Sequence, residues 1–288
     1  MVINMAKFVF SAFADEIDAD FDKQIEGLKN LNIDMIELRG VDGKSFVTLT
    51  DEEVYCVKQK LESNNIGISA LGTPIGKINV DGDFEAHKQL LTRIMDIGDI
   101  LGCKVLRMFS FYPADGINDD DFKRIAFEYI GVLLDMADER GFILCHENEK
   151  GIFGCSPERE LDLMQYFGGR LKAVLDPGNF AFCFEDASKG YPLLKDYIHY
   201  FHIKDADESG AIVPPGKGVA YLEETLRAVA SDRKDETVIL TMEPHLMNFT
   251  GLSSLSKLDD IHHVYSFETP FEAFKVATDA VRAMVEKL

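Results

Sequence analysis

The chain has 288 residues, of which 46% are apolar and 28% charged, a composition typical of a water-soluble globular protein. Its 50 acidic side chains outnumber the 30 basic ones, and the formal net charge is therefore −20. A surface this acidic repels phosphate backbones and anionic lipids, which argues against nucleic acids and membranes as partners.

The cysteine pattern and the N-terminal segment both bear on cellular location. The five cysteines are odd in number and include no C-x-x-C pair, which is typical of a reduced chain without disulfides. The first apolar run meets Asp15 and Glu16 too early for a signal peptide. No apolar run approaches the roughly 20 residues of a membrane-spanning helix. We therefore expect a cytoplasmic protein.

Apolar, strand-like segments alternate with amphipathic segments along the whole chain. Most of the apolar segments lack strict alternation, which indicates parallel strands buried on both faces. The amphipathic segments carry helix signals, such as the capping box that Thr50 and Glu53 form before an apolar run. The predicted strands are 8–13, 35–40, 66–72, 104–110, 142–147, 172–176, 200–204 and 238–243. The predicted helices are 20–31, 50–63, 83–102, 119–141, 156–169, 188–197, 221–232 and 269–288.

Eight strands alternating with eight helices predict a parallel sheet with right-handed crossovers, and eight such units close into a (β/α)8 TIM barrel. A doubly wound open sheet is the alternative, but no G-x-G-x-x-G motif follows the first strand. Because no linker or low-complexity tract divides the chain, we expect one domain over residues 1–288. The least patterned segment, 244–267, is a candidate lid at the catalytic face.

Four consecutive predicted strands end on polar side chains that can bind a metal ion. They are Glu147, Asp176, His202 and Glu243. Each alone is more often a loop residue, a helix cap or a packed histidine, so the prediction depends on all four together. In a barrel the carboxyl ends of the strands meet on one face, where three carboxylates repel one another unless a cation joins them. Oxygen ligands with one imidazole suit Mn2+, Mg2+ or Zn2+.

Further side chains near these strand ends are candidates for substrate binding. Arg39 and Arg107 project from the second and fourth strands, where a fixed guanidinium suits a carboxylate, a phosphate or vicinal hydroxyls. The other interpretation of the arginines is a buried ion pair with Glu37, Asp15 or Glu16. Lys204 and His245 follow the metal-ligand candidates by two residues, and Lys217 lies in the glycine-flanked turn `PPGKG`.

Two further groups of residues favour structural roles. Phe109, Phe111 and Tyr112 are more typical of barrel packing than of sugar stacking. His146 and Glu149 flank Glu147, and strand alternation directs them away from the site.

Several motifs occur in the order of a known family, from `SAFADEI`, `IELRG`, `LGTPIGKI` and `RMFSFY` to `HENEKGIFG`, `DPGNF`, `HIKDA`, `PPGKG` and `EPHL`. Nearly end to end, the chain resembles the xylose-isomerase-like TIM barrels, which include sugar phosphate isomerases/epimerases, tagatose 3-epimerase, inosose dehydratase and the apurinic-site endonucleases. The resemblance implies a metal ion held by Glu147, Asp176, His202 and Glu243. It also implies that Glu147 and Glu243 act as acid/base groups on opposite faces of the substrate.

The sequence departs from the patterns of this family in two places, and these departures limit which of its activities the resemblance implies. The epimerases have a histidine three residues after the metal-binding aspartate, whereas this chain has Asn179, which can donate hydrogen bonds to a substrate but cannot titrate. The endonucleases need further histidines at strand ends two to four, which this chain lacks.

The resulting hypothesis is a metal-dependent isomerase or epimerase in carbohydrate metabolism, acting on a small sugar, sugar phosphate or polyol through an enediolate. The alternatives are an inosose-type dehydratase on the same metal site and a non-catalytic sugar-binding barrel. A homo-oligomer is compatible with this hypothesis. The expected substrate-binding residues are Arg39, Arg107, Asn179, Lys204, Lys217 and His245.

Overall fold

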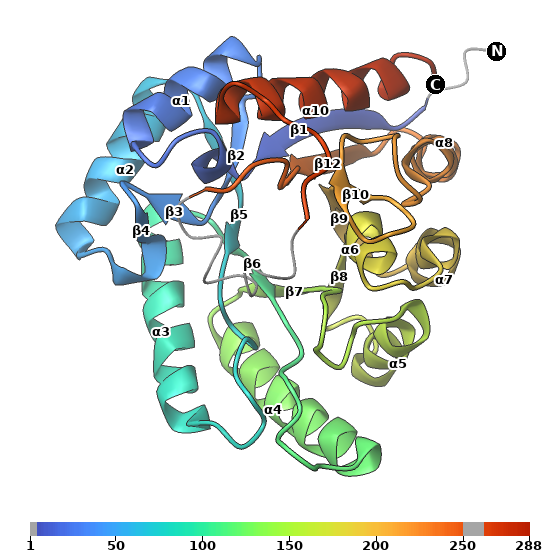
Figure 1. The fold of residues 1–288 in the computed structure, drawn as a ribbon. Coiled ribbons are helices and arrows are strands. Elements are labelled where there is room, and N and C mark those ends of the chain that lie inside the picture. The colour runs from blue at the N-terminus through green and yellow to red at the C-terminus, as the bar shows by residue number, and fades with distance from the viewer. Residues whose placement is uncertain (1–4, 250–261) are drawn as a thin grey trace.

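The computed structural model describes residues 5–249 and 262–288, and eight parallel strands at its centre form one sheet. The strands are β1 (Lys7–Ala12), β2 (Met35–Leu38), β5 (Gly67–Gly72), β6 (Val105–Met108), β7 (Ile143–Glu147), β8 (Lys172–Leu175), β9 (Ile198–Ile203) and β12 (Thr237–Met242). From β2 to β12 each strand pairs with the next one in chain order, and β12 pairs with β1, so the sheet curls into a barrel (Figure 1).

Helices surround the strands in a ring (Figure 1). They are α1 (Phe21–Asn30), α2 (Asp51–Ser63), α3 (Phe84–Leu101), α4 (Asp119–Glu139), α5 (Pro157–Phe167), α7 (Gly190–Leu194), α8 (Leu222–Asp232) and α10 (Pro270–Val285). Together with the sheet they confirm the predicted (β/α)8 barrel. None of the described helices combines the length and hydropathy that crossing a bilayer requires.

The strands bury both of their faces, as their sequences predict. Ala70, Cys145, Val174 and Tyr200 contact one another in a small cluster, while the neighbouring Leu144 joins the large apolar cluster that includes the helices. Because side chains alternate along a strand, one set fills the barrel and the other packs outward. This two-sided packing fixes the positions of the strand ends.

The barrel has one joint without a backbone ladder. Among the described residues β1 and β2 lie in contact, but the sheet order places them at its two ends. Side chains join this side of the barrel instead. The hydroxyls of Ser11 and Ser69 lie 2.6 Å apart, and Ser69 donates to the Ile36 carbonyl at 3.1 Å.

The structure corrects several predicted elements. The helix predicted at 188–197 is only α7, preceded by a 3-10 turn at Ala187–Lys189, and an unpredicted helix α6 spans Pro177–Phe182. Helix α6 begins there because Asp176 accepts the Asn179 backbone N–H at 2.9 Å and proline occupies its first turn.

The remaining corrections concern strands. Two-residue hairpins, absent from the prediction, follow β2 and β9; they are β3 and β4 (Gly40–Val41, Lys44–Ser45) and β10 and β11 (Asp205–Ala206, Ile212–Val213). The strands predicted at 35–40 and 104–110 end early, and Asp176 and Glu243 each follow their strand by one residue.

Half of the candidate lid at 244–267, residues 250–261, lies outside the described ranges. Its two described flanks contact the barrel mouth and each other. The backbone N–H of His245 donates to Glu16 Oε2 at 2.8 Å, and His263 Nε2 lies 2.8 Å from the His245 carbonyl oxygen. Closure over the site stays a prediction.

The loop after β5 is held against the barrel by a buried histidine. His87 Nε2 accepts the Gly76 backbone N–H at 2.7 Å, and Phe111 N donates to the Gly76 carbonyl at 2.9 Å. Gly76 has φ +86°, and a Cβ there would lie 2.0 Å from the Phe109 carbonyl oxygen, so only glycine fits. Burial lowers the pKa of His87 to about 4, which keeps its imidazole neutral and able to accept.

The depressed pKa of His87 predicts a pH-dependent stability. As pH falls from 6.5 towards 4, the unfolded chain binds a proton at His87 that the folded chain does not, so stability falls across this window. In His87→Gln, the glutamine oxygen still accepts from Gly76 but does not titrate. We expect the melting temperature of this variant to fall less steeply between pH 6.5 and 4 than that of the unmodified protein. Parallel slopes would contradict the assignment.

Candidate active site

The four polar strand ends predicted from the sequence come together at the mouth of the barrel. Glu147, Asp176, His202 and Glu243 are all buried, and one ligand atom from each lies within 4.8 Å of the others. They lie close together because the carboxyl ends of all the parallel strands in a barrel are on the same face. That this group binds a metal ion is not tested by the geometry and stays a prediction.

The donor atoms of this group fit a divalent cation. Asp176 Oδ2, His202 Nδ1 and Glu243 Oε2 are buried and make no hydrogen bond of good geometry to another described residue. Short contacts surround the imidazole nevertheless, with His202 Nδ1 at 3.0 Å from Glu147 Oε1 and 3.2 Å from Glu243 Oε2. Buried acceptors aimed at one point, together with one imidazole nitrogen, form a donor set suited to Mn2+, Mg2+ or Zn2+.

Repulsion among the carboxylates contributes to the raised pKa of Asp176. Burial raises the pKa of Asp176 to about 7, and Glu147 and Glu243 add to the increase, which Lys204 partly offsets. The Nζ atom of Lys204 lies 3.1 Å from Asp176 Oδ2 and 3.8 Å from Glu243 Oε2. Lys204 is therefore a buried counter-cation for two of the four residues, and the sequence prediction placed it correctly at the mouth.

Glu37 fixes the orientation of His202 and was missed as a site residue in the sequence. The Nε2 atom of His202 lies 2.9 Å from Glu37 Oε2, and the Tyr200 hydroxyl donates to Glu37 Oε1 at 2.8 Å. Burial alone would lower the pKa of His202, but Glu147 and Glu37 raise it well above its usual value. The negative surroundings that favour a proton on this imidazole also favour a metal cation, and the Glu37 contact leaves Nδ1 facing the carboxylates.

Arg39 orients Glu243. Its Nη1 donates to Glu243 Oε1 at 2.8 Å, while Nε and Nη2 bind both oxygens of Asp15 at 2.9 and 3.0 Å. The sequence interpretation of a buried ion pair is correct for Asp15 and for Glu16, which lies 3.3 Å from Nη2, but wrong for Glu37. Burial raises the pKa of Glu16 to about 8, although Arg39 opposes that rise.

Arg107 orients Glu147, as Arg39 orients Glu243. Its side chain is buried, its Nε lies 3.2 Å from Glu147 Oε2, and its Nη1 donates to the Thr73 carbonyl at 3.1 Å. The Nδ2 group of Asn179 donates to the other oxygen of Glu147 at 3.2 Å. Each glutamate is therefore held by its own guanidinium.

His245 also reaches the site, whereas Lys217 does not join it. His245 Nε2 lies 3.4 Å from Glu243 Oε1. Lys217 is exposed, and its recorded hydrogen bond is the one from its backbone N–H to the Pro214 carbonyl. The glycine turn around Lys217 has a structural cause, because Asp205 Oδ2 accepts the N–H groups of Gly216 and Gly218.

The residues assigned structural roles in the sequence have buried partners. His146 Nδ1 lies 2.9 Å from Glu160 Oε1, and Glu149 pairs with Lys77 at 3.3 Å. Phe109 is buried beneath the ammonium of Lys77, 4.3 Å from its ring centre. Lys77 was not singled out in the sequence, because a lysine in a loop has no local pattern that distinguishes it from a solvated one.

The fold and the buried group at its mouth define a (β/α)8 barrel with acidic side chains at its strand ends. The chain belongs to the xylose isomerase-like TIM barrel family, whose model matches residues 25–261. A comparison with curated proteins found no match.

Solved structures with the same fold cover almost the whole chain. The IOLI protein with a bound zinc atom is 18% identical, with a TM-score of 0.72 and 98% of each chain covered. D-Allulose 3-epimerase from Methylomonas sp. is 15% identical (TM-score 0.73), with 98% of this chain and 100% of that chain covered. The probable 3-DHS dehydratase AsbF from Bacillus anthracis is 12% identical (TM-score 0.72), with 96% and 99% covered. At these identities the likeness shows the fold.

The donor set predicts binding of about one divalent ion per chain. We expect elemental analysis of protein purified without chelator and dialysed against Mn2+ or Zn2+ to find it. At a free-metal concentration 100 times the dissociation constant, binding should stabilise the folded state by about 2.7 kcal/mol, visible as a raised melting temperature. If neither dialysis leaves metal bound to the protein, the prediction of a metal site is wrong.

The contact between Glu37 and His202 makes a separate prediction. Replacing Glu37 with glutamine keeps a hydrogen-bonding side chain but removes the negative charge behind the imidazole. We expect the Glu37→Gln variant to bind Zn2+ about 10- to 100-fold more weakly in titration calorimetry. Glu160→Gln is the matched control, because Glu160 also pairs with a buried histidine but outside the group of four. Equal losses in the two variants would count against a specific role for Glu37.

Proposed function

We propose that the protein is a metal-dependent isomerase or epimerase that acts on a small sugar, sugar phosphate or polyol by proton transfer through an enediolate. The observation that carries this proposal is the pair of buried glutamates, Glu147 and Glu243, each held by its own arginine beside one potential metal site. A protein that only bound sugars would not need two positioned carboxylates.

A divalent ion held by Glu147, Asp176, His202 and Glu243 would supply Lewis-acid stabilisation of negative charge on substrate oxygens. The glutamates themselves are suited to take a proton from carbon. Burial alone would raise the pKa of Glu243, but Lys204, His245 and His202 hold it well below the usual value. Burial acts in the same direction on Glu147, where His202 and Arg107 lower the pKa.

Both glutamates are therefore ionised at neutral pH, and each can act as a base. One takes the proton next to the carbonyl, and the other, once it has taken up a proton from solvent, delivers that proton to the opposite face or the neighbouring carbon. Arg39 and Arg107 keep the two carboxylates in place during this exchange. His245 and Lys204 lie close enough to Glu243 to hydrogen-bond substrate oxygens beside it.

The structural neighbours support this proposal in general terms, since they include a named 3-epimerase. They also keep dehydration as a second candidate, because one neighbour is named as a probable dehydratase. Both reactions begin with removal of a proton beside a carbonyl and differ in what the enolate does next. Cytoplasmic location and a homo-oligomeric state stay predictions from the sequence.

The proton-transfer mechanism predicts isotope exchange with solvent. Incubation with a panel of ketoses, their phosphates and inososes in heavy water should place deuterium on a carbon next to the carbonyl. An isomerase or epimerase returns a product of otherwise unchanged mass, which mass spectrometry distinguishes from the loss of one water by a dehydratase. Product formed without any solvent label would mean direct hydride transfer and would falsify the roles given to the glutamates.

Substitution of the glutamates should separate chemistry from stability. We expect Glu147→Gln and Glu243→Gln to lower kcat about 10²- to 10⁴-fold. The metal-free variants should stay folded but melt at a somewhat lower temperature than the unmodified protein, because each substitution removes the charge that Arg107 or Arg39 stabilises. A large loss of melting temperature would identify these residues as structural.

A further inference from the structure

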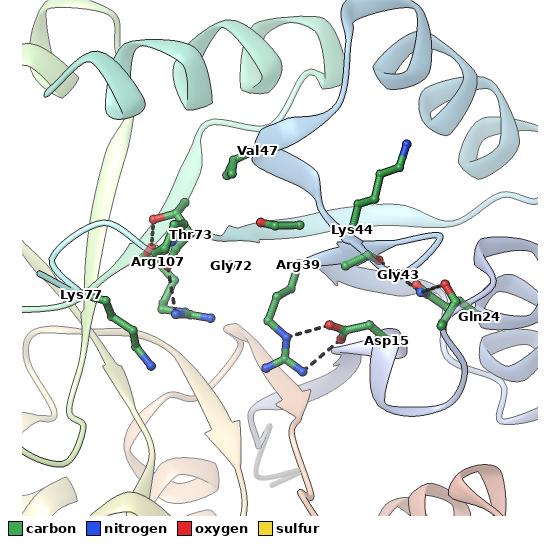
Figure 2. A pocket seen from close by; sticks show the side chains of 14 residues that line it. Asp15, Gln24, Arg39, Gly43, Lys44, Val47, Gly72, Thr73, Lys77 and Arg107 are labelled. Atoms are coloured by element: carbon green, nitrogen blue, oxygen red, sulfur yellow. Dashed lines mark hydrogen bonds and ion pairs between the residues drawn. The ribbon is translucent and has the colours of Figure 1, made fainter. Parts of the chain in front are cut away.

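A cavity of about 360 Å³ lies beside the carboxylate group, between the segments that follow β1, β2 and β5. Figure 2 shows its lining, in which Arg39 and Arg107 point towards each other and Lys77 approaches from the same side as Arg107. The described lining residues include four cationic side chains, with Lys44 as the fourth, and one carboxylate, Asp15. This local excess of positive charge is unusual in a chain of net charge −20.

Two of the four cations are already engaged elsewhere. Arg39 is surrounded by Asp15, Glu16 and Glu243, and each of its three nitrogens already donates to one of these acids. Lys44 turns away from the cavity in Figure 2, pairs with Glu53 at 3.0 Å and is 56% exposed. Neither is suited to bind an anion within the cavity.

Arg107 and Lys77 differ from these two: Arg107 is buried, the Lys77 side chain is only 9% exposed, and both lie against the ring of Phe109. The guanidinium carbon of Arg107 is 4.5 Å from the ring centre and the Lys77 ammonium 4.3 Å. Arg107 uses Nε towards Glu147 and Nη1 towards Thr73, and its Nη2 makes no hydrogen bond to a described residue.

The two cations also repel each other. Burial lowers the pKa of Lys77, Glu149 opposes this effect, and the positive charge of Arg107 lowers the pKa further. An anion placed between the guanidinium and the ammonium would relieve that repulsion while accepting hydrogen bonds from both.

We propose that the substrate carries a carboxylate, which binds between Arg107 Nη2 and Lys77 Nζ while the carbonyl end of the molecule lies at the carboxylate group. This inference rests on the proposed function and specifies its substrate class as hydroxy-carbonyl acids. A carboxylate fits better than a phosphate for two reasons. Its two oxygens match one guanidinium nitrogen and one ammonium, and both cations also face an acid, so a monoanion disturbs this charge balance less than a phosphate dianion does.

A matched series of ligands tests this assignment. D-Fructose, D-fructuronate and D-fructose 6-phosphate differ only at carbon 6, which carries a hydroxyl, a carboxylate or a phosphate, and the same three forms of D-tagatose make a second series. In titration calorimetry with the metal-loaded protein, we expect the uronate of at least one series to bind about tenfold or more tightly than both other forms. Absence of that preference in both series would overturn the proposal, as would tightest binding by a phosphate.

Two lysine variants locate the subsite. Lys77→Met should remove most of the preference for the uronate and leave the affinity for the neutral ketose within about twofold, since the ketose has no charge to lose. Lys44→Met is the matched control, because Lys44 lines the same cavity but pairs outside it, and it should change neither affinity. Equal effects of the two variants, or no effect of Lys77→Met, would exclude the site at Lys77.

The same ligands distinguish this inference from the proposed function. Solvent deuterium is followed by mass spectrometry in parallel with the binding measurement. Tight uronate binding without deuterium incorporation would support the carboxylate subsite and contradict the isomerase proposal. Deuterium incorporation into ketose and uronate with equal efficiency and equal affinity would support the isomerase proposal and overturn the subsite.

Discussion

Electrostatic repulsion among buried carboxylates is the constraint on which the mouth of this barrel depends. Glu147, Asp176 and Glu243 lie within 4.8 Å of one another, where carboxylates are stable only beside positive charge. Arg107, Lys204 and Arg39 supply that charge, one beside each acid. The cations therefore hold the acids in fixed positions, and a metal ion and substrate enter a site that is already ordered.

Much of the barrel could be predicted because its signals are local. Apolar runs followed by an acid or a histidine identified Glu147, Asp176, His202 and Glu243, and each lies within one residue of a strand end. Helix α6 (Pro177–Phe182) was missed because six residues are too few to show a helical repeat of apolar side chains. Lys217 was included for a glycine turn whose cause, Asp205, lies eleven and thirteen residues from the amides it binds.

The supporting contacts could not be predicted, because they join residues far apart in the chain. Glu37 and His202 are separated by 165 residues, and Arg39 and Glu243 by 204. The sequence indicated only that a charged residue lay on an apolar strand, without identifying its partner. The position of Lys77 depends on the folded loop that the hydrogen bond between Gly76 and His87 holds. The sequence therefore gives no signal for the contact between Lys77 and Phe109.

At the joint between β1 and β2, side-chain contacts take the place of a backbone ladder. Around the rest of the ring, backbone hydrogen bonds set the spacing of the strands, but here side chains do, through the serine contacts below and the pair of Arg39 with Asp15 above. The cavity opens over this joint. A ligand that contacts Arg39 or Glu243 therefore acts directly on the side chains that hold the two ends of the described sheet together.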